Sequence, residues 1–428
     1  MMRATNGDAS PCQRALTTSA REHFPFNTPG RSKGNQMSSR GMRALIGVAS
    51  ALGIGLITAL PAALPAAAAP APHRGLRLGH ALYDVGVHSN ITPAQAAGAA
   101  RAGTSFKQYT ATVNAPFGPY TYTIAGKNPA IKHSNPVSTI QTVLVPLIIK
   151  TPSGTWNPNK KDSCDSGASA TTRTVQSPIF VSQPWTWGGT SIGTGQVTDA
   201  FQRAEFWKYA KPSGINPGFA VNLKVRTIAP VTINVPEADQ ANGGDSCGNG
   251  LEEGIEITWL DGYLQSTVIP SLASKLGPTI VPIFLTHNVI EYVGTVTDCC
   301  VVGYHSAVST SSGIQTYVVA DYDNGGNFPV SPDISPLSNE IAEWQNDPYG
   351  TNQTPDWGDI GPVTNCTAGL EVGDPLGGTN FTDTVGSFTY HPQELAFFSW
   401  FYRQSPSLGV HGWYSDQGTF RTFSTDCN

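Results

Sequence analysis

One apolar stretch near the N-terminus constrains this chain more than any other feature. Arg40 and Arg43 precede an uninterrupted run of small and apolar residues from Ala44 to Leu60, and an alanine-rich segment, Ala66–Ala69, follows it. A positively charged start, an apolar middle and a small-residue end are typical of a secretory signal peptide. The run is at the short edge for a membrane-spanning helix, and no second run of this length follows. We therefore predict a secreted, extracellular protein that keeps no stable membrane span after signal cleavage.

The domain organisation follows from this signal. Residues 1–36 are rich in Arg, Ser, Gly and Asn and show no apolar periodicity, so we predict a non-structural extension there, with Met37 and Met42 as alternative translation starts. Residues 37–71 form the predicted signal peptide. Residues 72–428 contain no low-complexity linker, and we predict that they form a single elaborated extracellular domain of one or two lobes.

Cysteine usage agrees with export. One cysteine lies in the predicted extension, and the other six are Cys164, Cys247, Cys299, Cys300, Cys366 and Cys427. An even set in an exported chain predicts three disulfides, whose pairing the sequence leaves open. We expect Cys299 and Cys300 to bond to different partners, because a ring closed between adjacent residues strains the intervening peptide. A zinc–thiolate cluster is the less favoured alternative, since no Cys-x-x-Cys pair occurs.

The composition describes a soluble, loop-rich protein. Residues 72–428 carry 18 Lys and Arg against 28 Asp and Glu, and this acidic balance argues against nucleic acid as a partner. The 45 Gly and 33 Pro of the chain are spread without a repeat, which indicates many turns between short elements.

The pattern of apolar residues predicts an α+β fold with a mixed sheet, braced by disulfides. We expect helices at residues 92–102, 198–209, 260–276, 334–346 and 392–402. We expect strands at residues 142–150, 219–226, 279–285, 289–296, 301–305 and 315–322. A long Gly-, Pro- and Asn-rich loop region is expected between the last two helices.

The helix expected at residues 334–346 carries the residues that point to chemistry. With about 100° of rotation per residue, its polar residues fall within one arc of about 100°, and they are Asn339, Glu340, Glu343 and Asp347. The opposite side is apolar and should seat the helix on the sheet. Residues four apart on a helix can both reach one ion, as in zinc proteases, where an intervening Glu activates the water. In this zincin-like motif, Asn339 and Glu343 take the ligand positions and Glu340 takes the position of the general base.

This region resembles a family of secreted bacterial proteins. The resemblance rests on Ser338-Asn339-Glu340-Ile341-Ala342-Glu343-Trp344, then Asp347-Pro348, then Glu371-Val372-Gly373-Asp374-Pro375. The family signature is Ser-His-Glu-x-x-Glu, Asp-Pro and Glu-x-Gly-Asp, and it is also similar to that of the plant phosphate-induced, EXORDIUM-like proteins. Similar segments at 199–207, 299–305, 317–321 and 393–400 extend the resemblance over most of the chain after the signal. The resemblance implies a secreted, metallopeptidase-like protein.

The chain departs from this signature at one position that matters for metal binding. Where the family has His, this chain has Asn339, whose amide oxygen is a poorer zinc ligand than an imidazole nitrogen. We predict Glu340 as the catalytic residue, and as metal ligands Asn339, Glu343, Glu371 and Asp374. The ion is zinc if the motif functions as in zinc proteases, and calcium, a harder ion, is the alternative for oxygen ligands. The nitrogen that the motif lacks could come from His287, His305 or His391.

Three classes of function fit these observations. The first is a metal-dependent hydrolase that acts on a peptide or cell-wall substrate, in which Glu340 takes a proton from water. The second is a catalytically inactive relative that binds cell-wall glycan or extracellular protein, with some of its nine Trp and 14 Tyr as stacking platforms for sugars. The third is an exported protein that binds a small molecule or an ion. Asn339 favours the second class, whereas the retained carboxylates favour the first.

Overall fold

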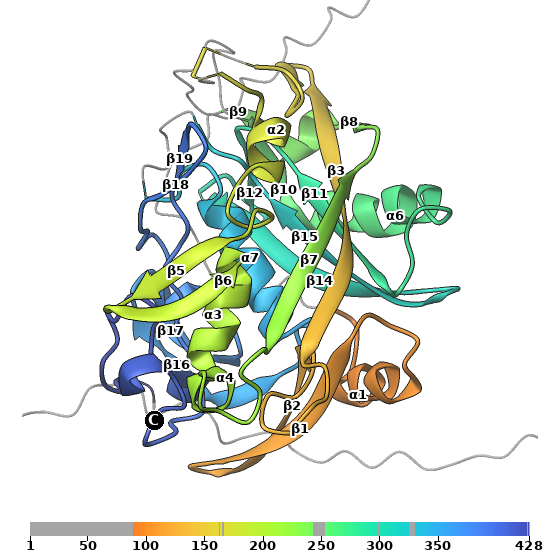
Figure 1. The fold of residues 1–428 in the computed structure, drawn as a ribbon. Helices are drawn as coiled ribbons and strands as arrows, with labels where there is room; N and C mark the ends of the chain where they lie inside the picture. Colours follow the sequence, from red (N-terminus) through yellow and green to blue (C-terminus); the bar gives the residue numbers. More distant parts are fainter. Residues whose placement is uncertain are drawn as a thin grey trace, which may run out of the picture. The chain divides into compact units, whose positions relative to one another are not determined.

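One long strand, β3 (Val137–Thr151), forms the axis of the fold in this computed structural model (Figure 1). The structure describes residues 89–161, 163–164, 167–242, 253–297, 299–324, 330–425 and 427, all of which belong to one compact unit, Pro70–Asn428. The predicted extension at 1–36 and the predicted signal peptide at 37–71 lie outside the described residues.

Short helices and strands alternate along the described residues. The helices are α1 (Pro93–Ala102), α2 (Ala170–Val175), α3 (Val197–Glu205), α4 (Trp207–Ala210), α5 (Ile257–Tyr263), α6 (Ile269–Ser271), α7 (Ser335–Asn346) and α8 (Phe398–Phe401). The other strands are β1 (Gln108–Ala115), β2 (Gly118–Ala125), β4 (Gly154–Trp156), β5 (Gln183–Trp187), β6 (Thr190–Gly195), β7 (Ala220–Thr227), β8 (Val231–Asn234), β9 (Gln240–Asn242), β10 (Glu253–Glu256), β11 (Ile280–Leu285), β12 (Val289–Tyr292), β13 (Cys299–Val301), β14 (Gly303–Thr310), β15 (Gly313–Ala320), β16 (Gln353–Ile360), β17 (Val363–Gly369), β18 (Asp383–Val385) and β19 (Phe388–Tyr390).

The largest sheet is mixed and has seven strands. On one side of β3, strands β7 and β8 pair with its first and second halves in parallel. On the other side, β11 and then β15 follow in parallel, and the antiparallel β14 forms the edge. The middle of β3 is apolar without alternation because both of its faces are covered.

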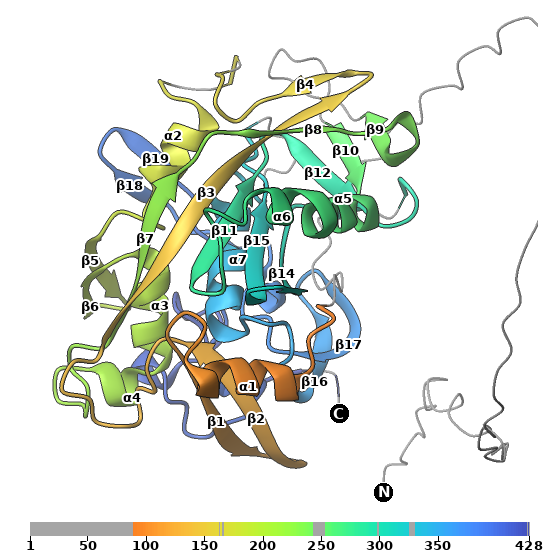
Figure 2. The same ribbon diagram turned by 90° about the vertical axis from the view of Figure 1, so that its right-hand side faces the viewer.

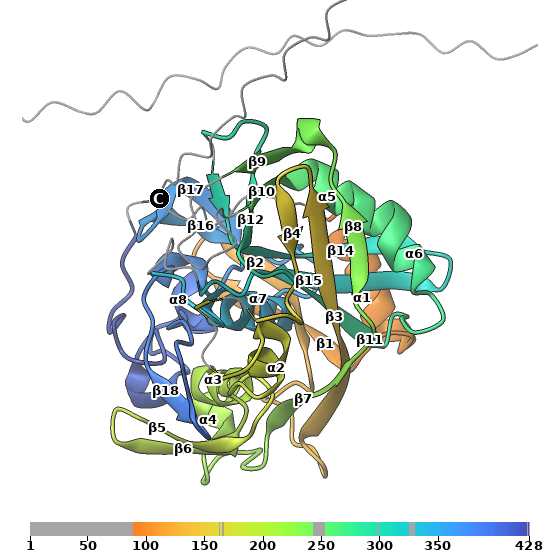
Figure 3. The same ribbon diagram turned by 90° about the horizontal axis from the view of Figure 1, so that it is seen from above.

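Two layers of helices cover the two faces of this sheet. On β11, Ile283 and Leu285 belong to a core shared with α3 and α7, whereas Phe284 belongs to a second core shared with α5 and α6. This alternation follows from the period of two along a strand. Figure 3 shows α7 and α3 on one side of the sheet and α5 and α6 on the other, and Figure 2 shows α5 and α6 in front of β11 and β15.

Smaller sheets complete the fold. A four-stranded sheet has the order β13-β12-β10-β9, and four hairpins, β1–β2, β5–β6, β16–β17 and β18–β19, form two-stranded sheets. The α+β class and the mixed sheet predicted from the sequence are therefore confirmed. Among the residues with a described structure, no helix combines the length and apolarity that crossing a bilayer requires.

Several predicted elements are present with nearly the predicted bounds. The first helix begins after Thr92, whose hydroxyl accepts from the backbone N–H of Gln95 while the Gln95 side chain accepts from the N–H of Thr92. This reciprocal capping is a local interaction that the sequence specifies directly. The predicted helix at 334–346 corresponds to α7, which ends at the predicted Asp347-Pro348 stop.

Other predicted elements differ from the structure, for local reasons in one case and because of contacts with distant segments in others. The helix expected at 198–209 breaks at Phe206, whose buried ring packs on Phe398 at 5.6 Å. The helix expected at 260–276 widens into a π-helical turn at 264–268 before Pro270, which has no N–H to continue the regular pattern. The loop expected after 347 contains the β16–β17 and β18–β19 hairpins. Residues 392–397 are not helical, because their backbone pairs with other loops, as where Phe381 N–H donates to the Pro392 carbonyl.

The disulfides agree with the prediction in part. Cys366 and Cys427 are bonded, which ties the C-terminal residues to β17. Cys164 is also disulfide-bonded, and Cys247 lies outside the described residues. The expectation that Cys299 and Cys300 bond to different partners was wrong, since they bond to each other within β13. The peptide bond between the two residues is cis.

Candidate metal-binding site

The helix α7 is enclosed on all sides. Every residue of α7 is buried, including the arc of Asn339, Glu340 and Glu343 that a solvated surface helix would expose. Its apolar side, with Leu337, Ile341 and Trp344, packs in the core beneath the sheet as the sequence predicts. Its acidic side faces β14 and the loop that follows β17. The carboxylates are therefore held in a protein interior, where an unpaired charge is costly.

His305 on β14 faces this acidic side. Residues on a strand alternate, and Tyr304 packs in the core on the α5–α6 side, so Gly303 and His305 face α7. A Cβ on Gly303 would lie 2.8 Å from Glu340 Cγ. The absence of a side chain at 303 thus lets the helix approach the strand closely enough for Glu340 to reach His305.

One imidazole and two carboxylates converge here. His305 Nδ1 lies 3.4 Å from Glu340 Oε2 and 3.8 Å from Glu343 Oε2. The ligand atoms of the three residues all lie within 4.8 Å of one another. The three side chains are only 5%, 7% and 4% exposed, respectively. This buried group can hold a metal ion.

Burial and the neighbouring carboxylates together set the pKa values of the cluster. Burial raises the pKa of Glu343, and the neighbouring charges of Asp374, Glu340 and Glu371 raise it further. Burial also raises the pKa of Glu340, against the opposing effect of His305. For His305, burial lowers the pKa, but Glu371, Glu340 and Asp347 outweigh it and raise the pKa to about 9. A proton on His305 therefore compensates the carboxylates at neutral pH when no cation is bound.

Backbone and amide donors fix the orientation of Glu343. Its Oε1 accepts from the Gly373 N–H at 3.0 Å. With the Asn339 amide nitrogen turned toward Glu343, that nitrogen donates to Oε1 at 2.9 Å and to Oε2 at 3.3 Å. A Cβ on Gly373 would collide with the Asn339 amide, so the loop after β17 packs tightly against the helix. Asn339 thus lies beside Glu343, four residues away on α7, and contacts its carboxylate.

The other predicted acids lie around this group. Glu371 Oε2 is 4.0 Å from His305 Nε2, and its side chain is 19% exposed, the most accessible of the four carboxyl and imidazole groups. Asp374 is buried near Glu343, whose pKa it raises. Asp347 caps the end of α7, where Thr351 N–H and Asn352 N–H donate to it at 2.9 and 2.7 Å. These donors compensate the unfavourable position of an acid at a helix C-terminus.

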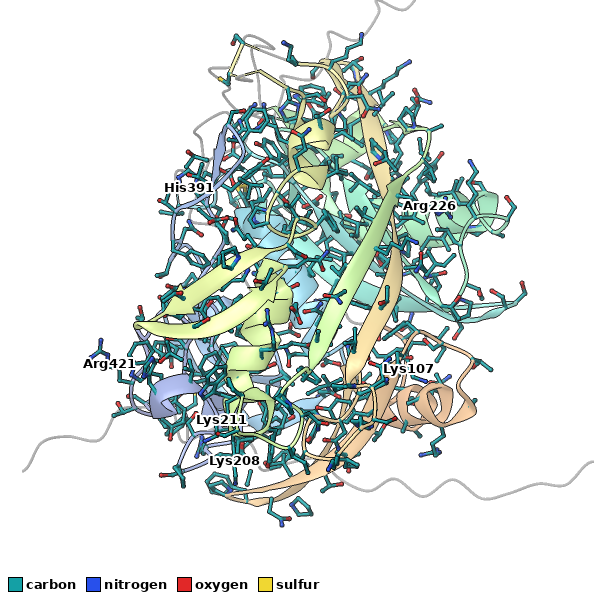
Figure 4. All side chains as sticks on the ribbon, viewed as in Figure 1. Lys107, Lys208, Lys211, Arg226, His391 and Arg421 are labelled. Carbon is teal, nitrogen blue, oxygen red and sulfur yellow. A yellow bond between two sulfur atoms is a disulfide. The ribbon has the colours of Figure 1, made fainter. Side chains whose placement is uncertain are left out.

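Only one of the three histidines considered from the sequence joins the cluster. His391 pairs with Asp333 at 2.6 Å and lies toward the edge of the view in Figure 4. His287 packs against the ring of Tyr322 at 6.1 Å. His305 takes part because β14 pairs with β15, with His305 opposite Val318. The alternation Gly303-Tyr304-His305 was the available sequence signal, but it does not identify the helix that covers the strand.

A second group of potential ligands is chemically unsuitable. Asp359, Cys366 and Cys427 lie close together. The two sulfurs are bonded to each other, and a disulfide offers no thiolate for a metal.

Comparison of the chain with protein-family models, with curated proteins and with solved structures finds no significant match. The case for a function therefore depends on the geometry of the His305 cluster.

Proposed function

We propose that this chain is a secreted, metal-dependent hydrolase whose cation is held by His305, Glu340 and Glu343. The observation that carries the proposal is the convergence of these three side chains from β14 and α7. Ligands at about 2.1 Å around a tetrahedral ion lie about 3.4 Å from one another. The separations of 3.4 and 3.8 Å from His305 Nδ1 to the two carboxylates fit such an ion.

The ligand chemistry favours zinc over calcium. Zinc takes nitrogen and carboxylate oxygen in four-coordinate sites, whereas calcium takes six to eight oxygens. Three protein ligands leave a position for water or substrate, as in catalytic zinc sites. A metal bound there would supply a Lewis acid for the scissile carbonyl and would acidify water near neutral pH.

The surrounding residues take distinct parts in this proposal. Glu340 is a ligand here rather than the general base that its place in the motif predicts. Glu371 is the carboxylate with solvent access, and it accepts the proton from water. Asn339 and the Gly373 N–H hold the Glu343 carboxylate toward His305, as outer-shell donors do in metal sites.

Metal content and hydrolysis together test the proposal. Protein expressed without residues 1–71, loaded with Zn²⁺ and dialysed, should retain about one equivalent by elemental analysis and should hydrolyse casein in a chelator-sensitive reaction. His305→Gln should lose the metal and the hydrolysis, while the control His391→Gln keeps both. Glu371→Gln should keep the metal and lose hydrolysis, whereas Glu340→Gln should lose both. A parent protein that retains no zinc would refute the metal site.

The burial of the cluster favours a second candidate function, that of an inactive binding protein stabilised by an ion. The ligand side chains are at most 7% exposed, which restricts access of a polymeric substrate. This candidate predicts that zinc raises the melting temperature while no casein or peptide is cleaved by the parent or by any variant.

A further inference from the structure

A pocket of about 390 Å³ lies apart from the His305 cluster, between the β1–β2 hairpin and the turn that joins α3 to α4. Figure 1 shows α4 beside this hairpin at the foot of the view. The C-terminal segment around α8 closes a further side, through Phe398 and Leu408. The volume falls within the range of about 300 to 1,000 Å³ that is typical of small-molecule sites.

Aromatic rings form a continuous wall of this pocket. Tyr109 and Tyr122 meet edge to face at 6.2 Å, and Tyr122 meets Phe398 at 4.8 Å. Phe398 in turn contacts Phe206 at 5.6 Å, and Tyr209 adds a further ring. Because the rings hold one another in place, the wall is a preformed apolar surface.

Uncharged polar groups complete the lining. They come from hydroxyl and amide side chains, among them Thr112, Asn114 and Gln404. The hydroxyl of Tyr109 is buried and has no hydrogen-bond partner among the described residues. Burial raises the pKa of Tyr122 to about 12 and that of Tyr109 well above its usual value, so both hydroxyls remain neutral donors. Of the described residues that line the pocket, none is charged.

We propose that this pocket binds an uncharged saccharide of one or two units. One face of a pyranose ring presents C–H groups that pack on aromatic rings, while its hydroxyls need donors and acceptors such as amides and the Tyr109 hydroxyl. A charged ligand would be desolvated in this lining without a countercharge, which is costly. Lys208 and Lys211, labelled beside α4 in Figure 4, are not lining residues, although Lys208 Nζ is 5.6 Å from the Tyr209 ring. This binding site goes beyond the proposed hydrolase and does not depend on it.

Calorimetric titration with four disaccharides tests the proposal. Cellobiose and N,N′-diacetylchitobiose are uncharged, chitobiose is cationic at neutral pH, and a digalacturonate is anionic. At least one uncharged disaccharide should bind with a Kd below about 10 mM, with both charged ones weaker. Binding should be unchanged by EDTA, because no lining residue belongs to the His305 cluster.

Two conservative variants locate the binding. Tyr109→Phe keeps the ring and removes the buried hydroxyl, and it should weaken the uncharged disaccharide about twofold to tenfold. The matched control is Tyr120→Phe, in the same hairpin but outside the lining, and it should bind as the parent does. Absence of binding by both uncharged disaccharides, preference for a charged one, or equal binding by Tyr109→Phe and the parent would each overturn the proposal.

Discussion

Cation binding at the His305 cluster should release protons, so its affinity should rise with pH. In the metal-free protein, burial lowers the pKa of His305, but Glu371, Glu340 and Asp347 raise it to about 9. Below that pH the imidazole must lose a proton before it can bind a metal. Each pH unit below the pKa reduces the deprotonated fraction about tenfold. Raising the pH from about 5.5 to 7.5 should therefore tighten Zn²⁺ binding about 100-fold, or by about 3 kcal/mol.

Calorimetry in buffers of different ionisation enthalpy measures this release directly. The expected value is at least one proton per ion at pH 7, since the raised pKa of Glu343 adds to the effect of His305. His391→Gln, which leaves the cluster intact, should show the same pH dependence. Affinity that stays constant between these pH values, with no proton release, would refute the electrostatic reasoning.

The same pKa shift has the opposite consequence for the stability of the metal-free fold. Because the folded pKa of His305 is raised from 6.5 to about 9, the stabilisation is fully present below about pH 6.5 and is lost as the pH rises through about 9. Unfolding of EDTA-treated protein should therefore become easier over this range, and the effect should be smaller in His305→Gln. An equal pH dependence in the variant would assign the change to other groups.

Three further predictions concern single residues. Burial raises the pKa of Glu205 from 4.5 to about 8. The contribution of this group to folding is therefore fully present below about pH 4.5 and is lost as the pH rises through about 8. In denaturant titrations the free energy of unfolding of the parent should fall by a few kcal/mol across that range, and Glu205→Gln should remove this fall. Asn339→Ala should weaken Zn²⁺ binding about 10- to 100-fold without abolishing it, because it removes a hydrogen-bond donor to the Glu343 carboxylate. An unchanged Kd would show that Asn339 does not position Glu343 for the metal. The double variant Cys366→Ser/Cys427→Ser opens a loop with a sequence separation of 61. In a denaturant titration it should lose about 4 kcal/mol of unfolding free energy. A loss near zero would show that packing, not the disulfide, holds the C-terminal segment.

Local patterns account for the parts of the fold that were predicted well. The capped helix α1 and the proline-stopped helix α7 depend on residues within one or two turns, and apolar runs such as that in β3 are readable without knowledge of their partners. The break at Phe206 and the non-helical backbone at 392–397 depend on contacts with distant segments, which the periodicity of the sequence does not contain.

The sequence by itself determined that Asn339, Glu340 and Glu343 share one side of a helix, because helical spacing is a local geometric rule. Only the tertiary structure decided that this side is buried and that His305, 35 residues before Glu340, faces it. That outcome depends on the register of β14 against β15 and on the close approach allowed at Gly303. The imidazole nitrogen that the helix lacks at position 339 is thus available from a strand. The packing of α7 against β14 brings together residues whose separation in sequence gives no sign of their proximity.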